Sequence, residues 1–165
     1  MLYLRKPTVA DVPAMVALMR PHILAERLLP RTPRQVAERL RDYVVAERWN
    51  GDEGPQASPR MVGVASISLV DMHLAEVGAL AGDEQDVQLA LVRHLLDEAL
   101  EMGVADAFVL TDEPELFEAL GFHRTAVQNI PEKRDRQCLR CARLPRCRQV
   151  ALTVHLGEAW SNAAK

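Results

Sequence analysis

Residues 74–111, LAEVGALAGDEQDVQLALVRHLLDEALEMGVADAFVLT, change the spacing of their apolar side chains twice. The alternation over 74–81 is typical of a half-buried strand. From Asp86 onward the apolar residues recur at helical spacing, which predicts a helix that ends at Gly103. The apolar run 107–110 then predicts a buried strand. A strand, a helix and a second strand in succession favour an α/β fold.

The segments before residue 74 predict further strands and helices by the same criteria. Thr8 with Asp11 three residues later, and Thr32 followed by Pro33, are typical of helix starts. The stretch 50–59 is rich in Gly, Pro, Asp and Asn, which favours a hairpin loop. In chain order we expect a strand at 2–5, a helix that follows the Thr8 start and has an apolar stripe from Val12, a helix from Pro33, a strand at 43–46 and a strand at 61–70.

The C-terminal part predicts a short helix and two more strands. The helix is expected over 112–120, with an Asp112-x-x-Glu115 start, and the strands over 122–127 and 150–156. A loop rich in Arg and Cys separates these two strands. The predicted fold class is therefore α/β (α+β), a mixed central sheet of about seven strands flanked by about four helices. We expect one domain over 1–157 and a disordered tail over 158–165.

The composition is that of a folded domain. The chain has 165 residues, of which 48% are hydrophobic and 26% charged, enough to bury a core of ordinary size. A net charge of −3 and 4% aromatic residues give neither a basic field nor base-stacking platforms, so no nucleic-acid partner is expected. No apolar run reaches the roughly 20 residues of a membrane span, and residues 1–12 lack the apolar core of a signal peptide. We expect no membrane partner and a cytoplasmic location.

Several short motifs resemble one enzyme family. Phe108–Thr111 followed by Leu116–Phe122 is similar to the FVLT…FFxxLGF run of N-acetylglutamate synthases and their short single-domain relatives. Residues 130–152 resemble the LPxK…CxxC…FPxC…IAM tail of those relatives, residues 28–32 their LLPRS turn, and residues 75–77 their AEI. The resemblance covers nearly all of 2–156. By it the chain is identified as a member of the GNAT N-acetyltransferases, and the GNAT fold is expected.

The resemblance also implies acetyl-CoA as co-substrate. In this family one strand pairs its backbone with the pantetheine arm, and the next helix binds the pyrophosphate at its start, where N–H groups and the helix dipole favour an anion. The residues expected to contact acetyl-CoA are Ala79, Leu80, Ala81, Asp86, Val87 and Gln88.

The phosphate-binding loop departs from the family pattern R/Q-x-x-G-x-G/A. This chain has Asp83, Glu84 and Asp86 where relatives have arginine and glycines. Carboxylates repel a pyrophosphate, although the same residues also suit an acidic helix start stabilised by its own dipole. Just upstream, Gly78 and Ala79 replace an Arg and a Ser of the relatives. The sequence therefore predicts a degenerate acetyl-CoA site.

The resemblance assigns a catalytic role to Glu76 and substrate binding to Arg31, Lys133 and Arg146. Only a neutral amine attacks a thioester, so a carboxylate at Glu76 would accept the proton that leaves the substrate ammonium. The alternative for Glu76 is a strand-end residue in a surface ion pair. Cations at the other three positions suit the two carboxylates of a glutamate-like acceptor, and arginine biosynthesis is the implied context. The basic segment 133–148 has two further interpretations, a solvated loop and a nucleic-acid site.

Cys138, Cys141 and Cys147 leave three interpretations open. Cys138 and Cys141 have the Cys-x2-Cys spacing of one pair of zinc ligands. A closed structural zinc site has four ligands, and the sequence has no second pair at a suitable spacing. A disulfide or redox role is the second interpretation. Reduced structural thiols are the third, and an odd number of cysteines fits a reducing compartment. We expect reduced cysteines and no metal.

Two functions of different classes follow. One is an active N-acetyltransferase that transfers acetyl from acetyl-CoA to the amine of a small, glutamate-like amino acid. The other is a catalytically inactive GNAT-fold protein that binds a ligand or a partner, which the acidic loop favours. An acyltransferase with a different donor is a third alternative. The expected partner is a small-molecule amino acid, and a homodimer is an open alternative.

Overall fold

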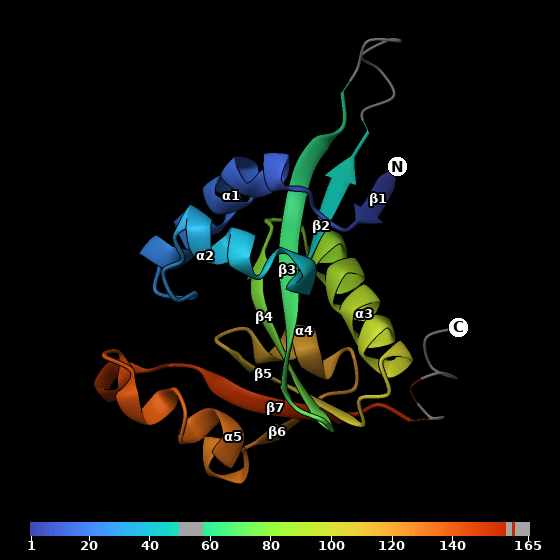
Figure 1. The fold of residues 1–165 in the computed structure, drawn as a ribbon. Coiled ribbons are helices and arrows are strands. Elements are labelled where there is room, and N and C mark those ends of the chain that lie inside the picture. The colour runs from blue at the N-terminus through green and yellow to red at the C-terminus, as the bar shows by residue number, and fades with distance from the viewer. Residues whose placement is uncertain (50–57, 158–159, 161–165) are drawn as a thin grey trace. The chain divides into compact units, whose positions relative to one another are not determined.

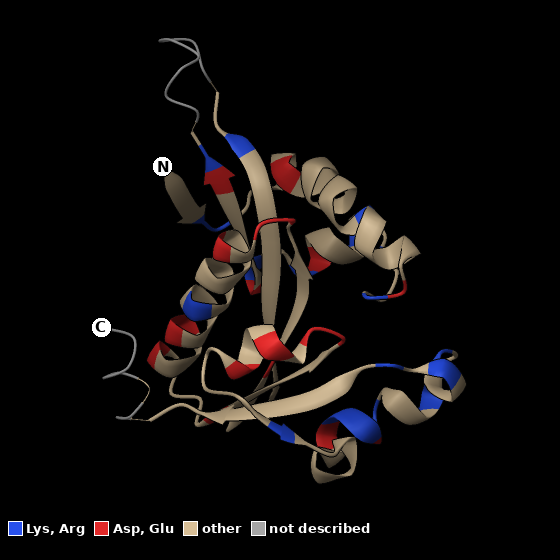
Figure 2. Cartoon of the chain, turned by 180° about the vertical axis from the view of Figure 1, so that it is seen from behind, with Lys and Arg blue, Asp and Glu red and all other residues tan. Residues whose placement is uncertain are grey.

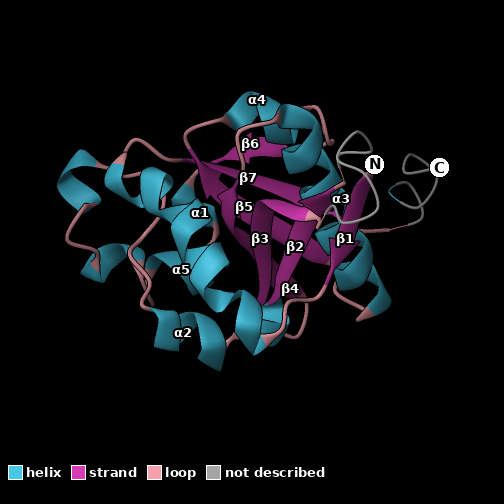
Figure 3. Ribbon diagram, turned by 90° about the horizontal axis from the view of Figure 1, so that it is seen from above, coloured by secondary structure: helices cyan, strands magenta, loops and turns pink. Residues whose placement is uncertain are grey.

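The computed structural model describes residues 1–49, 58–157 and 160. Most of the predicted loop at 50–59 and of the predicted tail at 158–165 lies outside these residues. The described strands form one mixed sheet of seven, in the order β1-β2-β3-β4-β5-β7-β6. The elements are β1 (Leu2–Arg5), α1 (Val12–Leu24), α2 (Pro33–Glu38), β2 (Tyr43–Arg48), β3 (Arg60–Asp71), β4 (Leu74–Ala81), α3 (Gln85–Glu101), β5 (Asp106–Thr111), α4 (Pro114–Glu118), β6 (His123–Thr125), α5 (Pro131–Arg134) and β7 (Val150–His155) (Figures 1 and 3).

The chain divides into two compact units. The first comprises Met1–Ile67 and Ala79–Leu95, and the second comprises Ser68–Gly78 and Leu96–Lys165. The division passes through β3, β4 and α3, so each of these elements contributes residues to both units. Each unit has a hydrophobic core of its own.

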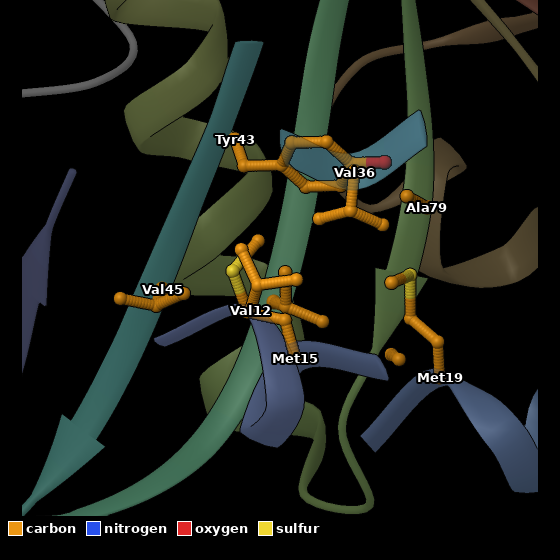
Figure 4. Close-up of a cluster of buried hydrophobic side chains, with 9 residues drawn as sticks. Val12, Met15, Met19, Val36, Tyr43, Val45 and Ala79 are labelled. Atoms are coloured by element: carbon orange, nitrogen blue, oxygen red, sulfur yellow. The ribbon is translucent and has the colours of Figure 1, made fainter. Parts of the chain in front are cut away.

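The core of the first unit lies between two helices and the strands beside them. β2 pairs antiparallel with β1 and with β3, and Val45 lies opposite Val64 in the second pair. The apolar stripe of α1 is buried as its helical spacing predicts. The buried cluster consists of Val12, Met15, Met19, Val36, Tyr43, Val45, Val64, Ala79 and Ala81 (Figure 4).

Arg5 of β1 joins the start of α1 to β2 through two carboxylates. Its guanidinium donates hydrogen bonds to Asp11 at 2.8 and 2.9 Å and to Glu47 at 2.5 Å. Asp11 also accepts the backbone N–H of Thr8 at 2.6 Å, so the predicted helix start is confirmed. The hydrogen bond from Arg5 holds the pKa of Asp11 well below its usual value, against the opposing effect of desolvation. The ionised form of Asp11 therefore favours the folded state.

Asp11→Asn is expected to lower the free energy of unfolding by about 1 to 3 kcal/mol at pH 7, because it removes charge-assisted hydrogen bonds. A depressed pKa stabilises the fold above the unfolded-state pKa of about 3.9, and this stabilisation is lost as the pH falls towards the depressed value. Urea unfolding of both proteins at pH 7 and at pH 3 measures the effect. The difference in the free energy of unfolding between the wild type and Asp11→Asn should be smaller at pH 3 than at pH 7. An equal difference at both pH values would contradict the stabilising role of the Asp11 carboxylate.

Gly63 of β3 lets the start of α3 approach the sheet. A Cβ atom at this position would lie 2.6 Å from Val87 Cγ1 and 2.8 Å from Leu91 Cδ1. Both side chains are fully buried, and the β-branched Val87 has little rotamer freedom in a helix. A side chain at position 63 therefore cannot fit unless Val87 and Leu91 change their side-chain conformations or α3 shifts.

Gly63→Ala is expected to destabilise the first unit by about 1 to 3 kcal/mol through overpacking. Adding Val87→Ala makes room for the new methyl group, so the double variant should be more stable than the sum of the two single effects predicts. Denaturant titration of the four proteins tests this. Additive single effects would show that the two positions do not compete for the same space.

The core of the second unit lies between β4, β5, β7 and the segment before α5. Leu74–Val77 of β4 pairs parallel with Asp106–Val109 of β5, as a strand-helix-strand connection requires. β7 pairs antiparallel with β5 and with β6. The buried residues of this cluster are Leu74, Phe108, Ile130 and Ala151.

Most of the predicted elements are confirmed, and several differ in their bounds. The strand predicted at 74–81 has these bounds, and Thr32 caps α2 by accepting the N–H of Gln35 at 3.2 Å. The prediction of an Asp112-x-x-Glu115 start for α4 is wrong, because the Thr111 hydroxyl accepts the N–H of Glu113 at 3.0 Å and the helix begins at Pro114.

The C-terminal elements differ in length and number from the prediction. The strand predicted at 122–127 is confined to His123–Thr125. The segment predicted as a loop before β7 contains α5 and three short 3₁₀ turns, so the described chain has five α-helices where about four are expected from the sequence. In the predicted tail, Trp160 is only 8% exposed and its indole N–H donates to Asp97 at 3.1 Å. Across the described ranges, no helix combines the length and the hydropathy needed to cross a bilayer.

Candidate functional site

The segment expected to contact pantetheine contains an unusual backbone conformation. Ala79 in β4 has a φ of +49°, in the left-handed region that residues with a side chain avoid. Ala79 and Ala81 are buried in the first unit, whereas Leu80 is half-buried. The packing around Ala79 must hold this conformation against a local cost of about 1 to 2 kcal/mol. Strain of this kind is often found at functional positions.

The residues expected to bind pyrophosphate form the first turn of α3. Gln88 folds back on the loop, and its side-chain amide donates to the carbonyl of Gly82 at 2.7 Å. Val87 is fully buried, whereas Asp86 is exposed. A Cβ atom at Gly82 would lie 3.1 Å from the carbonyl oxygen of Val62, so the turn before the helix is tightly packed. Backbone N–H groups at such a helix start attract anions.

An arginine from β2 pairs with the acidic loop. Nη2 of Arg48 lies 2.8 Å from Glu84 Oε2 and 3.1 Å from Asp86 Oδ2. The hydrogen bond from Arg48 lowers the pKa of Asp86, burial opposes it, and the N–H of Val87 lowers it further. Two of the three carboxylates of the loop predicted to repel pyrophosphate are therefore paired with a cation from β2.

Arg48 is held in place although one of its donors is unsatisfied. Its Nε atom is buried and has no hydrogen-bond partner among the residues that the structure describes. Leaving a buried donor without a partner is unfavourable. The contacts with Glu84 and Asp86 offset this cost, so these two carboxylates fix the position of the guanidinium.

Glu76 of β4 forms an ion pair with Lys133 of α5. Lys133 Nζ lies 2.6 Å from Glu76 Oε1, and it also donates to the side-chain oxygen of Gln137. The side chains of Lys133 and Glu76 are 10% and 19% exposed. Of the alternatives for Glu76, an ion pair is present, but it is largely buried and lies inside the strand.

The short helix that carries Lys133 is anchored in the second unit. Ile130 precedes it and is buried in the core of that unit, and its N–H donates to Val127 at 2.9 Å. Pro131 then occupies the first helical position, where a missing N–H costs little. The N–H of Gln137 donates to the carbonyl of Lys133 at 3.0 Å, which brings both side chains to the same side of the turn.

Arg31 and Arg146 belong to different units and make different contacts. Arg31 Nη1 donates to the carbonyl of Leu29 at 3.4 Å. Burial raises the pKa of Tyr43, and the charge of Arg31 opposes this effect. Arg146 is exposed and donates to the carbonyl of Ala142 at 3.4 Å. Of the residues predicted to act in catalysis or to bind the acceptor, Glu76 and Lys133 are in direct contact.

Lysines and arginines gather in the segment from α5 to the start of β7 (Figure 2), and two of these arginines make contacts within the second unit. Arg136 donates to the carbonyl of Val70 at 3.0 Å, and Arg134 pairs with Asp135 at 2.7 Å.

The three cysteines are free thiols, and burial raises the pKa of Cys138 while the charge of Lys133 lowers it. Within the described ranges no three potential ligands are grouped closely enough to hold a metal ion.

Two residues at the candidate site have no counterpart in the sequence prediction. Arg48 lies 36 residues before Glu84, and no motif of the chain connects them. Gln137 follows Lys133 by four residues, which on a helix places two side chains on one face. That spacing is the signal by which Gln137 could be found.

Comparison with known proteins identifies relatives of this chain. No protein-family model matches it. Over 156 residues it is 26% identical to the uncharacterized N-acetyltransferase CT2212 of Chlorobaculum tepidum, covering 92% of this chain and 95% of that protein.

Solved structures share the fold at low sequence identity. N-acetylglutamate synthase of Neisseria gonorrhoeae, complexed with coenzyme A and N-acetyl-glutamate, superposes with a TM-score of 0.78 at 22% identity, over 96% of this chain but 36% of the synthase. The Mycobacterium tuberculosis protein Rv2747, in complex with CoA, gives 0.75 at 20% identity, over 94% and 99% of the two chains. The putative acetyltransferase yncA of Salmonella typhimurium, solved with acetyl-CoA, gives 0.71 at 15% identity, over 96% and 95%. The chain therefore has the GNAT acetyltransferase fold, and its sequence is similar to the Chlorobaculum tepidum N-acetyltransferase over nearly its whole length.

Proposed function

We propose that this chain is an N-acetyltransferase that transfers the acetyl group of acetyl-CoA to the amine of a small amino acid with a glutamate-like side chain. The observation that carries this proposal is the environment of Glu76. Its Oε1 atom accepts a hydrogen bond from the ammonium of Lys133 at 2.6 Å, and 19% of the Glu76 side chain remains exposed. A carboxylate that is held by a cation and is still partly exposed suits an acceptor of the amine proton.

The reaction that follows is a direct transfer. The neutral amine nitrogen forms a bond to the thioester carbonyl carbon, and the carbon–sulfur bond breaks. The nitrogen then loses a second proton, which the departing thiolate of CoA takes up, so the products are the N-acetyl amide and free CoA. The proton lost by the substrate ammonium passes to Glu76 Oε2, directly or through one water molecule. Holding this carboxylate in one orientation lets proton removal accompany attack.

The residues at the start of α3 fit acetyl-CoA on one condition. Gly82 and Gly63 allow the backbone to pack closely there, and the 17-residue helix supplies a strong dipole. The exposed Asp86 carboxylate lies in this first turn and repels a pyrophosphate, so it must move aside when pyrophosphate binds. Arg48 is then the nearby cation that we expect to face the phosphates. Ala79, Leu80 and Ala81 are proposed to pair with the pantetheine arm.

The acceptor is proposed from the relatives and from the cations of the chain. The Neisseria relative was solved with N-acetyl-glutamate, and glutamate carries two carboxylates that arginine can bind in a bidentate manner. Arg31 and Arg146 are the proposed partners of these groups. Under this proposal the chain would act in arginine biosynthesis.

An acetyl-transfer assay tests the proposed function. Purified protein is incubated with acetyl-CoA and one of several amines, namely glutamate, aspartate, glutamine, lysine and a short peptide, and the free CoA thiol is measured. Glutamate is expected to give the highest kcat/KM. If another amine is preferred, the acceptor assignment is wrong but the transferase proposal stands. If no amine raises thiol release above spontaneous hydrolysis, the transferase proposal is wrong.

A further inference from the structure

The ammonium of Lys133 is occupied by groups of its own chain. A lysine ammonium has three N–H donors, and in the described chain two of them are directed to Glu76 and Gln137. The residue is only 9% exposed. A buried lysine needs such partners, because an unpaired buried charge is strongly unfavourable.

The backbone around Lys133 also fixes the direction of the side chain. Ile130, three residues earlier, is 3% exposed within the hydrophobic core, and the N–H of Lys133 donates to its carbonyl at 3.1 Å. Glu76, the partner of Lys133, lies on β4 between two buried residues, Ala75 and Val77. The ion pair therefore joins two elements that are each anchored by packing. Arg146, by contrast, is exposed.

We propose that Lys133 is a positioning residue for Glu76 and does not bind the carboxylate of the acceptor. It holds Oε1, so that Oε2 faces the incoming amine in one orientation. The inference rests on the acetyltransferase function proposed above and differs from the substrate-binding role that the family resemblance implies. A group that orients the proton acceptor affects the rate of the bound complex, whereas a carboxylate-binding group affects the affinity for the acceptor.

Steady-state kinetics of Lys133→Met separates the two roles. Loss of orientation is expected to lower kcat about 10- to 100-fold, the size of effect that a small misplacement of a reacting group produces. The KM for the amino acid should stay within about twofold of the wild-type value. Lys133→Arg, which keeps a cationic donor, should recover part of kcat. Arg140→Met removes an exposed cation of the same segment and should leave both constants unchanged.

A double-mutant cycle with Glu76→Gln sharpens the test. If Lys133 acts only through Glu76, adding Lys133→Met to Glu76→Gln should lower kcat by a further factor of less than about three. The effects of two residues that act as a unit are not additive. If the two losses multiply, the proposal is wrong. Circular dichroism of each variant establishes that it is folded. Should Lys133→Met fail to fold, Gln137→Leu removes the other partner of the ammonium but keeps the contact with Glu76. A smaller fall in kcat at constant KM is then expected, and a rise in KM at constant kcat would contradict the positioning role.

The outcomes separate the two proposals. A wild-type protein without acetyl transfer overturns the proposed function and this inference with it. An active wild type in which Lys133→Met raises the KM of the amino acid and keeps kcat overturns only the positioning role, and assigns Lys133 to the substrate carboxylate.

Discussion

Glu76→Gln is expected to lower kcat for acetyl transfer by about 10²- to 10⁴-fold, the range by which a positioned general base accelerates a reaction. Glutamine keeps the size of the side chain and an oxygen that accepts the N–H of Lys133, so the contact at 2.6 Å has a replacement. It cannot accept a proton at neutral pH. The affinity for acetyl-CoA should be unchanged, because the variant leaves Ala79–Ala81 and the start of α3 intact.

The matched control for this variant is Glu101→Gln, the same change at an exposed residue at the C-terminal end of α3. It should have wild-type kinetics. Thermal unfolding of both variants shows whether a fall in kcat comes from a destabilised fold after loss of the buried ion pair, and not from loss of the proton acceptor. A folded Glu76→Gln protein with kcat within about threefold of the wild type would exclude Glu76 as the proton acceptor.

Removing the charges of the loop is expected to raise the affinity for acetyl-CoA. In Glu84→Gln/Asp86→Asn, two carboxylates near the proposed pyrophosphate site become neutral, and Arg48 loses both of its partners and becomes available to the phosphates. In an exposed site, each like charge at contact distance lowers the binding affinity by about a factor of ten or less. We therefore expect the Kd for acetyl-CoA to fall by about 10- to 100-fold.

Three further measurements define this effect. Arg48→Met should weaken binding, and a rise in ionic strength should reduce the gain of the double variant, because exposed charges are screened by salt. Glu101→Gln lies at the other end of the same helix and should not change the Kd. If the double variant binds acetyl-CoA more weakly than the wild type, Glu84 and Asp86 position Arg48 for the cofactor and do not repel it.

The sequence predicts the elements well because local patterns decide them. The switch from alternation in β4 to helical spacing in α3 requires only neighbouring residues, and the caps at Thr8 and Thr32 act within one turn. The start of α4 was missed because the Thr111 hydroxyl accepts the N–H of Glu113 in a turn before the helix, and the helix then begins at Pro114 without a side-chain cap. Competition between adjacent polar side chains is not visible in a spacing pattern.

The contacts of the candidate site are predicted less well because they join distant segments. The resemblance singled out Glu76 and Lys133, but nothing in the sequence pairs two residues 57 positions apart. The acidic loop at 83–86 was interpreted from its own charges, and its partner Arg48 comes from another strand. Charge pairing of this kind depends on how strands and helices are brought together, so it emerges only in the folded structure.

Calorimetric titration of the wild-type protein with acetyl-CoA tests the central claim most directly. The proposed function requires one binding site per chain with a Kd below about 1 mM, the upper end of the range of ordinary enzyme substrates. Saturable heat of binding in that range, abolished by competing CoA, is the result expected. An absence of heat at millimolar acetyl-CoA would contradict an acetyltransferase function for this chain.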